Sequence, residues 1–375
     1  DTFQEVYNYS RQQAEELGRS LHKEKMLYHV CNAHGYKDVG YFYRLQCHHT
    51  PAVLNSFCIW KDNYTQLLHC SEVAEGVQMK LQEIMDSITD ADTGRVDYSR
   101  AAKLGDLCTE LDFAVCEFQM VQLARLDKTE LLAFGLNVFQ IFLHYAFIKV
   151  GIPSSTSSSA HSAFWTGLKF NVGGDLYSFH EWWNGICRGN RKGPHGPKPF
   201  QGKDTRRYLK LPDSVDPRIH FAAGASHFMR PMTLYTGGRM NRELEYAAEI
   251  YCKNSAWIWV QEAAETLTFC ANFQAYLTDF APATMDLPTS IMKWLPRRER
   301  VYVAKMLSMQ NKLKVKFKGD VKCDGWEEFA GEHIVFKTCP KADFKTILSL
   351  SSVGADLGVK SALSKGLSQT KLLLA

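Results

Sequence analysis

The stretch Leu131-Leu-Ala-Phe-Gly-Leu-Asn-Val-Phe-Gln-Ile-Phe-Leu-His-Tyr-Ala-Phe-Ile148 contains eighteen residues and no charged side chain. Its length is close to what a helix needs to cross a lipid bilayer. Asn137, Gln140 and His144 interrupt it at spacings of three and four residues, and such polar groups are costly in lipid. The pattern therefore predicts a helix over Glu130–Lys149 that is buried at the centre of a folded domain.

Other elements are predicted on both sides of this helix. A long helix begins at Ser71, whose following glutamates favour a helix N-terminus. A second amphipathic helix covers Met240 to Tyr251, and Leu313 to Lys318 alternates like a half-exposed strand with a basic outer face. We therefore predict an α+β fold, a helix-rich domain with a small antiparallel sheet and a buried central helix.

The composition excludes several classes of function. Hydrophobic residues make up 45% of the 375 residues, enough for a sizeable core. The net charge of +4 comes from 44 basic and 40 acidic residues, a balance that argues against a nucleic-acid partner. The sequence contains no GxGxxG after a strand, no GxxxxGK[ST], no HExxH and no GxSxG. We predict no cofactor.

The cysteines point to a reducing compartment. The chain has eleven, an odd number without a CxxC pair, which fits reduced thiols in a cytoplasmic protein. The cluster Cys47-His48-His49 has the side chains that soft metals prefer. A single short cluster of this kind is typical of an ordinary loop, so no metal site is predicted.

The segment Asp216-Pro-Arg-Ile-His-Phe-Ala-Ala-Gly-Ala-Ser-His-Phe-Met-Arg-Pro-Met-Thr-Leu-Tyr235 carries the most informative histidine. We predict a short strand over Arg218–Ala222, broken by Gly224. Two interpretations of His220 remain open. The side chain lies at the floor of a pocket, or it is a core histidine beside a tight turn.

This segment resembles the signature of the family DUF547, a domain of unknown function. The family pattern reads Pro-Arg-Ile-His-Phe-Ala, then Leu-Asn-Cys-Gly-Ala, then a small residue and Ser-Cys-Pro-Pro. Residues Pro217 to Ala222 match it, as do Gly224 and Ala225. Further matches are Ala133-Phe-Gly-Leu-Asn137, the Gly173-Gly174 hairpin and Asn184-Gly-Ile-Cys-Arg188. The resemblance extends from about Ser71 to Trp326.

The resemblance implies nucleophilic chemistry that this chain has lost. In members of the family, a cysteine thiolate, a histidine imidazole and an acidic residue would lie together in one site and suit nucleophilic catalysis. This catalytic role is inferred from the residue types alone. Here the second cysteine position holds Phe228 or Met229, and the helix glutamate is Trp183. The remnant site comprises His220, Asn137, Asn184 and Ser226. Ser226 and His227 are neighbours, which on an extended strand point to opposite faces.

The ends of the chain differ from the middle. The run Ala14-Glu-Glu-Leu-Gly-Arg-Ser-Leu, followed by Tyr28-His-Val and Tyr41-Phe-Tyr-Arg-Leu, resembles the second half of a DEP domain, a winged-helix module. Residues 346–375 read as a weakly amphipathic tail. The predicted organisation is a partial DEP-like segment over 1–66, a DUF547-like domain over 71–340 and the tail.

Two functions from different classes follow. The first is a non-catalytic protein that acts as a structural or protein-binding component of a larger assembly. Trp182, Trp183, Phe228 and Met229 are its candidate contact residues, since aromatic residues and Met are enriched in interfaces. The alternative is a thiol-hydrolase-like or transferase-like enzyme whose site is rebuilt around His220. The loss of two chemical residues, each to a large apolar one, favours the first.

Overall fold

The computed structural model describes residues 53–55, 69–92, 96–151, 158–211, 214–225, 232–253, 257–309, 313–318 and 334–335. The predicted DEP-like segment lies outside these residues except for 53–55. The Cys47-His48-His49 cluster and the tail 346–375 also lie outside them. Within the described residues the fold class is α+β, as predicted.

The helix α5, Lys128–Val150, is the centre of the fold. Asp127 begins it with a capping box, because its Oδ1 accepts hydrogen bonds from the backbone N–H groups of Thr129 and Glu130 at 2.8 Å. Glu130 completes the box by accepting from the Asp127 N–H at 3.0 Å. By length and composition α5 could cross a membrane, but 89% of its most apolar window is buried inside the protein. The predicted buried central helix is confirmed.

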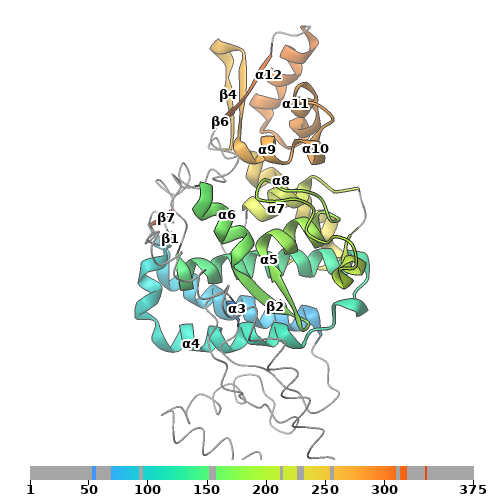
Figure 1. The fold of residues 1–375 in the computed structure, drawn as a ribbon. Helices are drawn as coiled ribbons and strands as arrows, with labels where there is room; N and C mark the ends of the chain where they lie inside the picture. Colours follow the sequence, from blue (N-terminus) through green and yellow to red (C-terminus); the bar gives the residue numbers. More distant parts are fainter. Residues whose placement is uncertain are drawn as a thin grey trace, which may run out of the picture.

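Three helices and a hairpin surround α5 (Figure 1). The helices α3, Cys70–Ile88, and α4, Gly105–Ala114, lie along one side. The strands β2, Lys169–Val172, and β3, Asp175–Ser178, form an antiparallel pair after α6, Ser158–Gly167. The hairpin turn uses Gly173 and Gly174, whose φ angles of 63° and 91° suit glycine. The predicted Gly-Gly hairpin is therefore confirmed.

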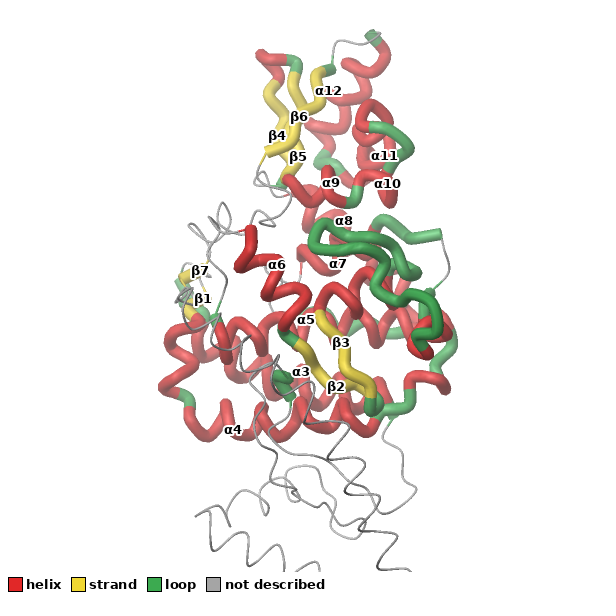
Figure 2. The backbone as a smooth tube through the Cα atoms, viewed as in Figure 1, coloured by secondary structure: helices red, strands yellow, loops and turns green. Residues whose placement is uncertain are grey.

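A separate lobe stands on this body (Figures 1 and 2). It holds a sheet of three strands in the order β4-β5-β6, antiparallel then parallel. The strands are β4 Ile258–Gln261, β5 Thr266–Cys270 and β6 Lys314–Lys318. The helices are α9 Ala271–Ala275, α10 Leu277–Phe280, α11 Leu287–Ile291 and α12 Arg297–Ser308. The lysines of β6 are exposed, which confirms the predicted strand with a basic outer face.

The helices α7, Arg218–Ala225, and α8, Met240–Lys253, join the body to the lobe. Ile219 and Leu244 belong to the hydrophobic core around α5. Phe221 and Tyr251, from the same two helices, belong to the core of the lobe. Both helices thus bury residues on two sides, and side chains between the two cores can meet there. The short strands β1, Val96–Asp97, and β7, Ile334–Val335, pair in parallel elsewhere.

Candidate functional site

His220 lies on a helix rather than on the predicted strand. Pro217 precedes α7 immediately, and Asp216 accepts a hydrogen bond from the Arg218 N–H at 2.9 Å. Proline and an acceptor side chain at these positions favour the start of a helix. The alternation of apolar residues that suggested a strand has another cause. Ile219 and Phe221 are buried in two different cores on two sides of α7.

His220 forms a hydrogen bond with a buried carboxylate. Its Nε2 lies 2.8 Å from Oδ2 of Asp279, which is on α10. The side chain of Asp279 is 0% exposed and that of His220 is 7% exposed. Because the carboxylate accepts, Nε2 carries the proton and Nδ1 carries the lone pair in the neutral ring. Within the described residues, no hydrogen bond to Nδ1 is found.

Two arginines compensate the charge of Asp279. Arg188 Nε donates to Oδ2 at 2.5 Å, and Arg191 Nη1 donates to Oδ1 at 2.7 Å. The Arg188 guanidinium also stacks over the ring of Tyr276, 4.4 Å from its centroid. The carboxylate therefore accepts from two cations and one imidazole. We call Asp279, Arg188, Arg191 and His220 the ion cluster.

A π-helix places the arginines. The segment η4, Glu181–Cys187, has the wide π-helical turn that often occurs at functional sites. Asn184 on this helix accepts from Arg188 Nη1 at 2.5 Å and donates from its Nδ2 to His180 Nδ1 at 3.1 Å. His180 Nε2 in turn contacts the Pro197 carbonyl at 2.9 Å. A chain of hydrogen bonds thus runs from a loop through the π-helix to His220.

The protonation states follow from burial and from these partners. Burial lowers the pKa of His220 below its ordinary value, although the hydrogen bond to Asp279 acts in the opposite direction. Burial of Asp279 opposes its ionisation, but hydrogen bonds from His220 and Arg188 outweigh burial and hold its pKa well below the ordinary range. At neutral pH His220 is therefore neutral and Asp279 is charged.

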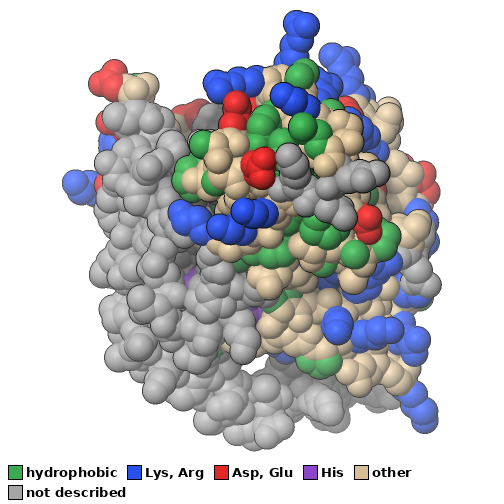
Figure 3. Space-filling view, turned by 90° about the horizontal axis from the view of Figure 1, so that it is seen from above, with side chains coloured by type: hydrophobic (Ala, Val, Ile, Leu, Met, Phe, Trp, Pro, Cys, Tyr) green, Lys and Arg blue, Asp and Glu red, His purple; other side chains and the backbone are tan. Residues whose placement is uncertain are grey.

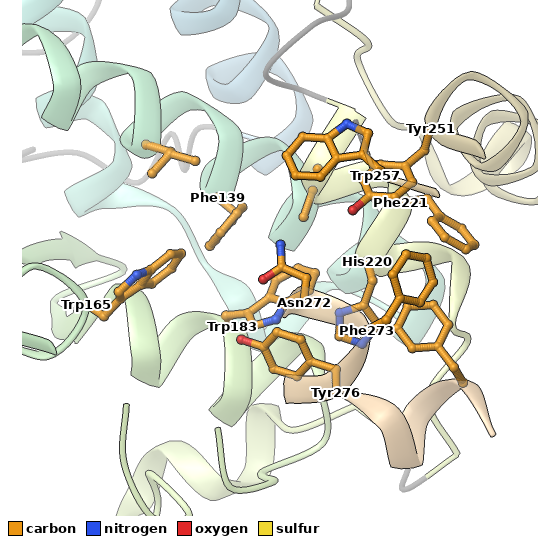
Figure 4. A pocket seen from close by; sticks show the side chains of 14 residues that line it. Phe139, Trp165, Trp183, His220, Phe221, Tyr251, Trp257, Asn272, Phe273 and Tyr276 are labelled. Carbon is orange, nitrogen blue, oxygen red and sulfur yellow. The ribbon is translucent and has the colours of Figure 1, made fainter. Parts of the chain in front are cut away.

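A small cavity of about 60 Å³ adjoins His220. Most of its fourteen lining residues are aromatic (Figure 4). Trp183, Asn272, Tyr276 and His220 lie together in this view, and Tyr251 and Trp257 lie across from them. Gly224 leaves the space that Tyr251 occupies, because a Cβ atom there would lie 2.3 Å from the Tyr251 ring. The cavity is thus an aromatic pocket with few polar groups.

The polar groups of the wall are those of His220 and Asn272, the tyrosine hydroxyls and the indole N–H groups of the tryptophans. The Tyr251 hydroxyl contacts Cys270 Sγ at 3.3 Å, and burial raises its pKa well above the ordinary value. The Asn272 side chain has no hydrogen bond to another described residue. Among the described residues that line the cavity, none is a cysteine, serine, threonine or lysine.

The remnant site predicted from the sequence is only partly assembled. Asn184 joins His220 through Arg188 and Asp279. Asn137 does not reach His220, because its side chain exchanges two hydrogen bonds with the backbone of Tyr235, at 2.8 and 2.9 Å. The hydrogen-bond partner of His220 is instead the carboxylate of Asp279. Ser226 lies outside the described residues.

The candidate contact residues are buried where they are described. Trp182 is 0% exposed and Trp183 is 3% exposed. Trp182 donates from Nε1 to the Gly135 carbonyl at 2.9 Å, and Trp183 packs on Phe139 at 4.9 Å between ring centroids. The assignment of these two to a protein interface is corrected, because they form core contacts in this structure. Phe228 and Met229 lie outside the described residues.

No motif in the sequence predicts a role for Asp279. It stands alone between Thr278 and Phe280, in no motif that the family signature covers. Arg188 ends the family-like run Asn184-Gly-Ile-Cys-Arg188, which assigns it no role. Glu181, the first residue of the π-helix, accepts a hydrogen bond from Arg206 Nη2 at 2.8 Å and does not contribute to the ion cluster. One signal was available, a single acid within the aromatic-rich stretch from Phe273 to Phe280.

Comparison with protein families bears on this same part of the chain. Residues 123–252 match the family DUF547, described as a protein of unknown function. The DUF547 match includes α5, the π-helix, α7 and most of α8, and so contains His220, Asn184 and Arg188. It ends before the lobe that supplies Asp279. Comparisons with curated proteins and with solved structures found no significant match.

Proposed function

We propose that this chain is a non-catalytic protein that serves as a binding component of a larger protein assembly. In this proposal the ion cluster holds the body and the lobe together, and the aromatic cavity receives a small apolar group of a partner. The DUF547 match supplies no reaction, since that family's function is unknown. The proposal rests on the chemistry around His220.

The main support for the proposal is that two arginines already neutralise the negative charge of Asp279. In a catalytic His–Asp pair the carboxylate is held to stabilise the imidazolium that forms when histidine takes a proton. Here Arg188 and Arg191 already neutralise Asp279. Protonating His220 would add a second net positive charge to a buried cluster, which is unfavourable at low dielectric. His220 is therefore suited to hydrogen bonding rather than to proton abstraction.

The cavity wall supports the same conclusion. Among its described residues it lacks a thiol, an aliphatic hydroxyl and an amine, so no described wall residue can act as a cysteine, serine, threonine or lysine nucleophile beside His220. A volume of about 60 Å³ is small beside the roughly 150 Å³ of an apolar cavity that holds benzene. A methyl or isopropyl group of a partner's side chain would fit this space. Aromatic walls would contact it on several sides.

Electrophile labelling tests the proposal. The protein and its His220→Asn variant are treated with a fluorophosphonate and with iodoacetamide, and modified residues are mapped by mass spectrometry. We expect no modification whose rate falls in the variant, and we expect the variant to melt at a lower temperature. His69→Asn is the control, because His69 is exposed. A residue whose labelling requires His220 would overturn the proposal.

The cavity has its own test. Ala223 lines it, and Ala223→Leu should fill it. Native partners captured by cross-linking to the wild type should be lost from this variant, while its melting temperature stays within a few degrees. Retention of every partner would show that the cavity takes no part in the assembly.

An enzyme rebuilt around His220 remains the second candidate. The observation that favours it is the orientation of the ring, with Nε2 on Asp279 and no hydrogen bond to Nδ1 from the described residues. Histidines that act as bases are held in this way by a carboxylate. Labelling that depends on His220 would support this candidate.

Two further points of organisation are part of the proposal. The domain boundaries at 1–66, 71–340 and 346–375 are retained as proposals. A cytoplasmic location is also proposed, supported by the six free cysteines of the described residues.

A further inference from the structure

The strand β6 presents an edge of the lobe's sheet. In the order β4-β5-β6 it pairs with β5 and with no other strand of the described chain. Edge strands carry unpaired main-chain groups that can hydrogen-bond to another extended chain. Adding a strand at such an edge is a recurring way in which proteins bind extended peptides.

The side chains of β6 divide cleanly between its two faces. Val315 and Phe317 are partly buried and pack on the core of the lobe. Lys314, Lys316 and Lys318 are exposed on the other face. Figure 3, which views the molecule from the side of the lobe, shows Lys and Arg side chains at several places around it. The edge is therefore lined by three lysines on one face of the sheet.

The strand also turns main-chain groups outward. Lys314 N–H donates to the Glu265 carbonyl at 2.8 Å, so this residue's amide faces β5. Main-chain groups alternate in direction along a strand, which directs those of Val315 and Phe317 away from β5. These outward groups lie between the exposed lysines along the same edge.

The charge of the lysines would favour some partners of this edge over others. A second copy of β6 at this edge would bring lysines close to lysines, which is unfavourable. An extended segment with acidic side chains at every second residue would instead place carboxylates beside Lys314 and Lys316. On β6 and on an added strand alike, side chains two residues apart are separated by about 6.6 Å, so acidic side chains on the partner would match the spacing of the lysines.

We propose that β6 binds an extended acidic segment of a partner protein by strand addition, with the acidic side chains on the lysine face. The main chain of β6 supplies hydrogen bonds, and the lysines supply the preference for acidic sequences. The site is separate from the cavity beside His220, and it does not depend on the function proposed there.

A labelled synthetic peptide tests the proposal by fluorescence anisotropy. The probe has about nine residues, longer than a typical strand, and alternates Glu with Thr. We expect saturable binding that weakens about tenfold or more in the Lys314→Glu, Lys316→Glu double variant. The control is Lys198→Glu, Lys203→Glu, two exposed loop lysines whose reversal makes the same change in net charge. Its affinity should stay within about threefold of the wild type.

Two altered peptides separate charge from strand addition. Replacing Glu with Gln should weaken binding as the lysine reversal does. Methylating alternate backbone nitrogens keeps the charge but removes main-chain donors, and it should also abolish binding. Unchanged binding of the methylated peptide would overturn strand addition. Absence of binding by the Glu peptide would overturn the proposal altogether. Tighter binding of single-stranded oligothymidylate or of phosphatidylserine vesicles, sensitive to the same lysines, would assign the face to a nucleic acid or a membrane instead.

Discussion

Two buried polar clusters hold this protein together by different chemistry. The ion cluster joins α7, α10 and the residues around the π-helix through Asp279. The second, which we call the amide cluster, consists of Asn137, Gln140 and Gln78. Its amide groups donate to backbone carbonyls of residues 232–235, at 2.8, 2.7 and 2.9 Å.

The two clusters differ in charge, and therefore in how strongly each depends on its hydrogen-bond and ion-pair partners. Amides are neutral, so their hydrogen bonds to the backbone do not depend on pH. The ion cluster buries charges, and such an arrangement is favourable only while every partner is present. The amide cluster thus fixes the path of a backbone segment, whereas the ion cluster fixes side chains in one protonation state. Mutations should separate the two.

Removing the charge of Asp279 should have the largest effect. Asp279→Asn leaves Arg188 without a carboxylate in a buried site, and we expect a loss of about 3–5 kcal/mol in the free energy of unfolding. Urea denaturation measures it. Asp204→Asn is the matched control, because Asp204 also pairs with an arginine but its side chain is 20% exposed. That control should lose about 1 kcal/mol or less. Equal losses would contradict the account.

Breaking the amide cluster should cost less. Asn137→Leu keeps a similar volume but leaves the buried N–H and C=O of Tyr235 without their partner. We expect a loss of about 1–3 kcal/mol, the same at pH 7 and pH 5 because no charge is involved. Denaturant unfolding at both pH values checks this. A loss that changes with pH would mean that the two clusters are coupled.

Replacing two different glycines with alanine should change the stability of the protein in opposite directions. Gly224→Ala would push Tyr251 out of the cavity wall and should destabilise the protein by about 1–3 kcal/mol. Gly76→Ala, within α3, meets nothing within 4 Å and should stabilise by about 0.5–1 kcal/mol. Thermal unfolding of both variants measures the difference. A neutral Gly224→Ala would show that the wall beside the ion cluster is loosely packed.

The pH dependence of the free energy of unfolding should be the smallest of these effects, and we expect it to arise from His220 in the ion cluster. Because the folded pKa of His220 lies below its ordinary value of 6.5, folding favours the neutral ring. Its contribution is complete above pH 6.5 and is lost as pH falls through the folded pKa. His220→Asn should therefore flatten the decline in stability between pH 7 and pH 5. An unchanged slope in that variant would assign the decline to other groups.

Elements with one buried face or a continuous apolar run could be predicted from the sequence. The helices α5 and α8 and the strand β6 have such patterns, and the structure contains all three. The sequence of α7 wrongly predicts a strand. Its apolar residues are buried in two cores on two sides of the helix, so apolar positions recur every second residue as they do in a strand. Asp279 could not be placed beside His220 because 59 residues separate them and no local pattern reports that contact. His220 itself was found, but its partners come from the packing of the lobe on the body.

The most direct test of the central claim is a titration of the His220 imidazole by NMR, with nitrogen shifts that also report its tautomer. We predict a ring protonated on Nε2 that stays neutral at pH 7 and titrates below 6.5, because burial and the two arginines disfavour the imidazolium. A pKa above 6.5 would show that Asp279 stabilises the imidazolium despite its arginines. That result would contradict a purely structural role and favour a base.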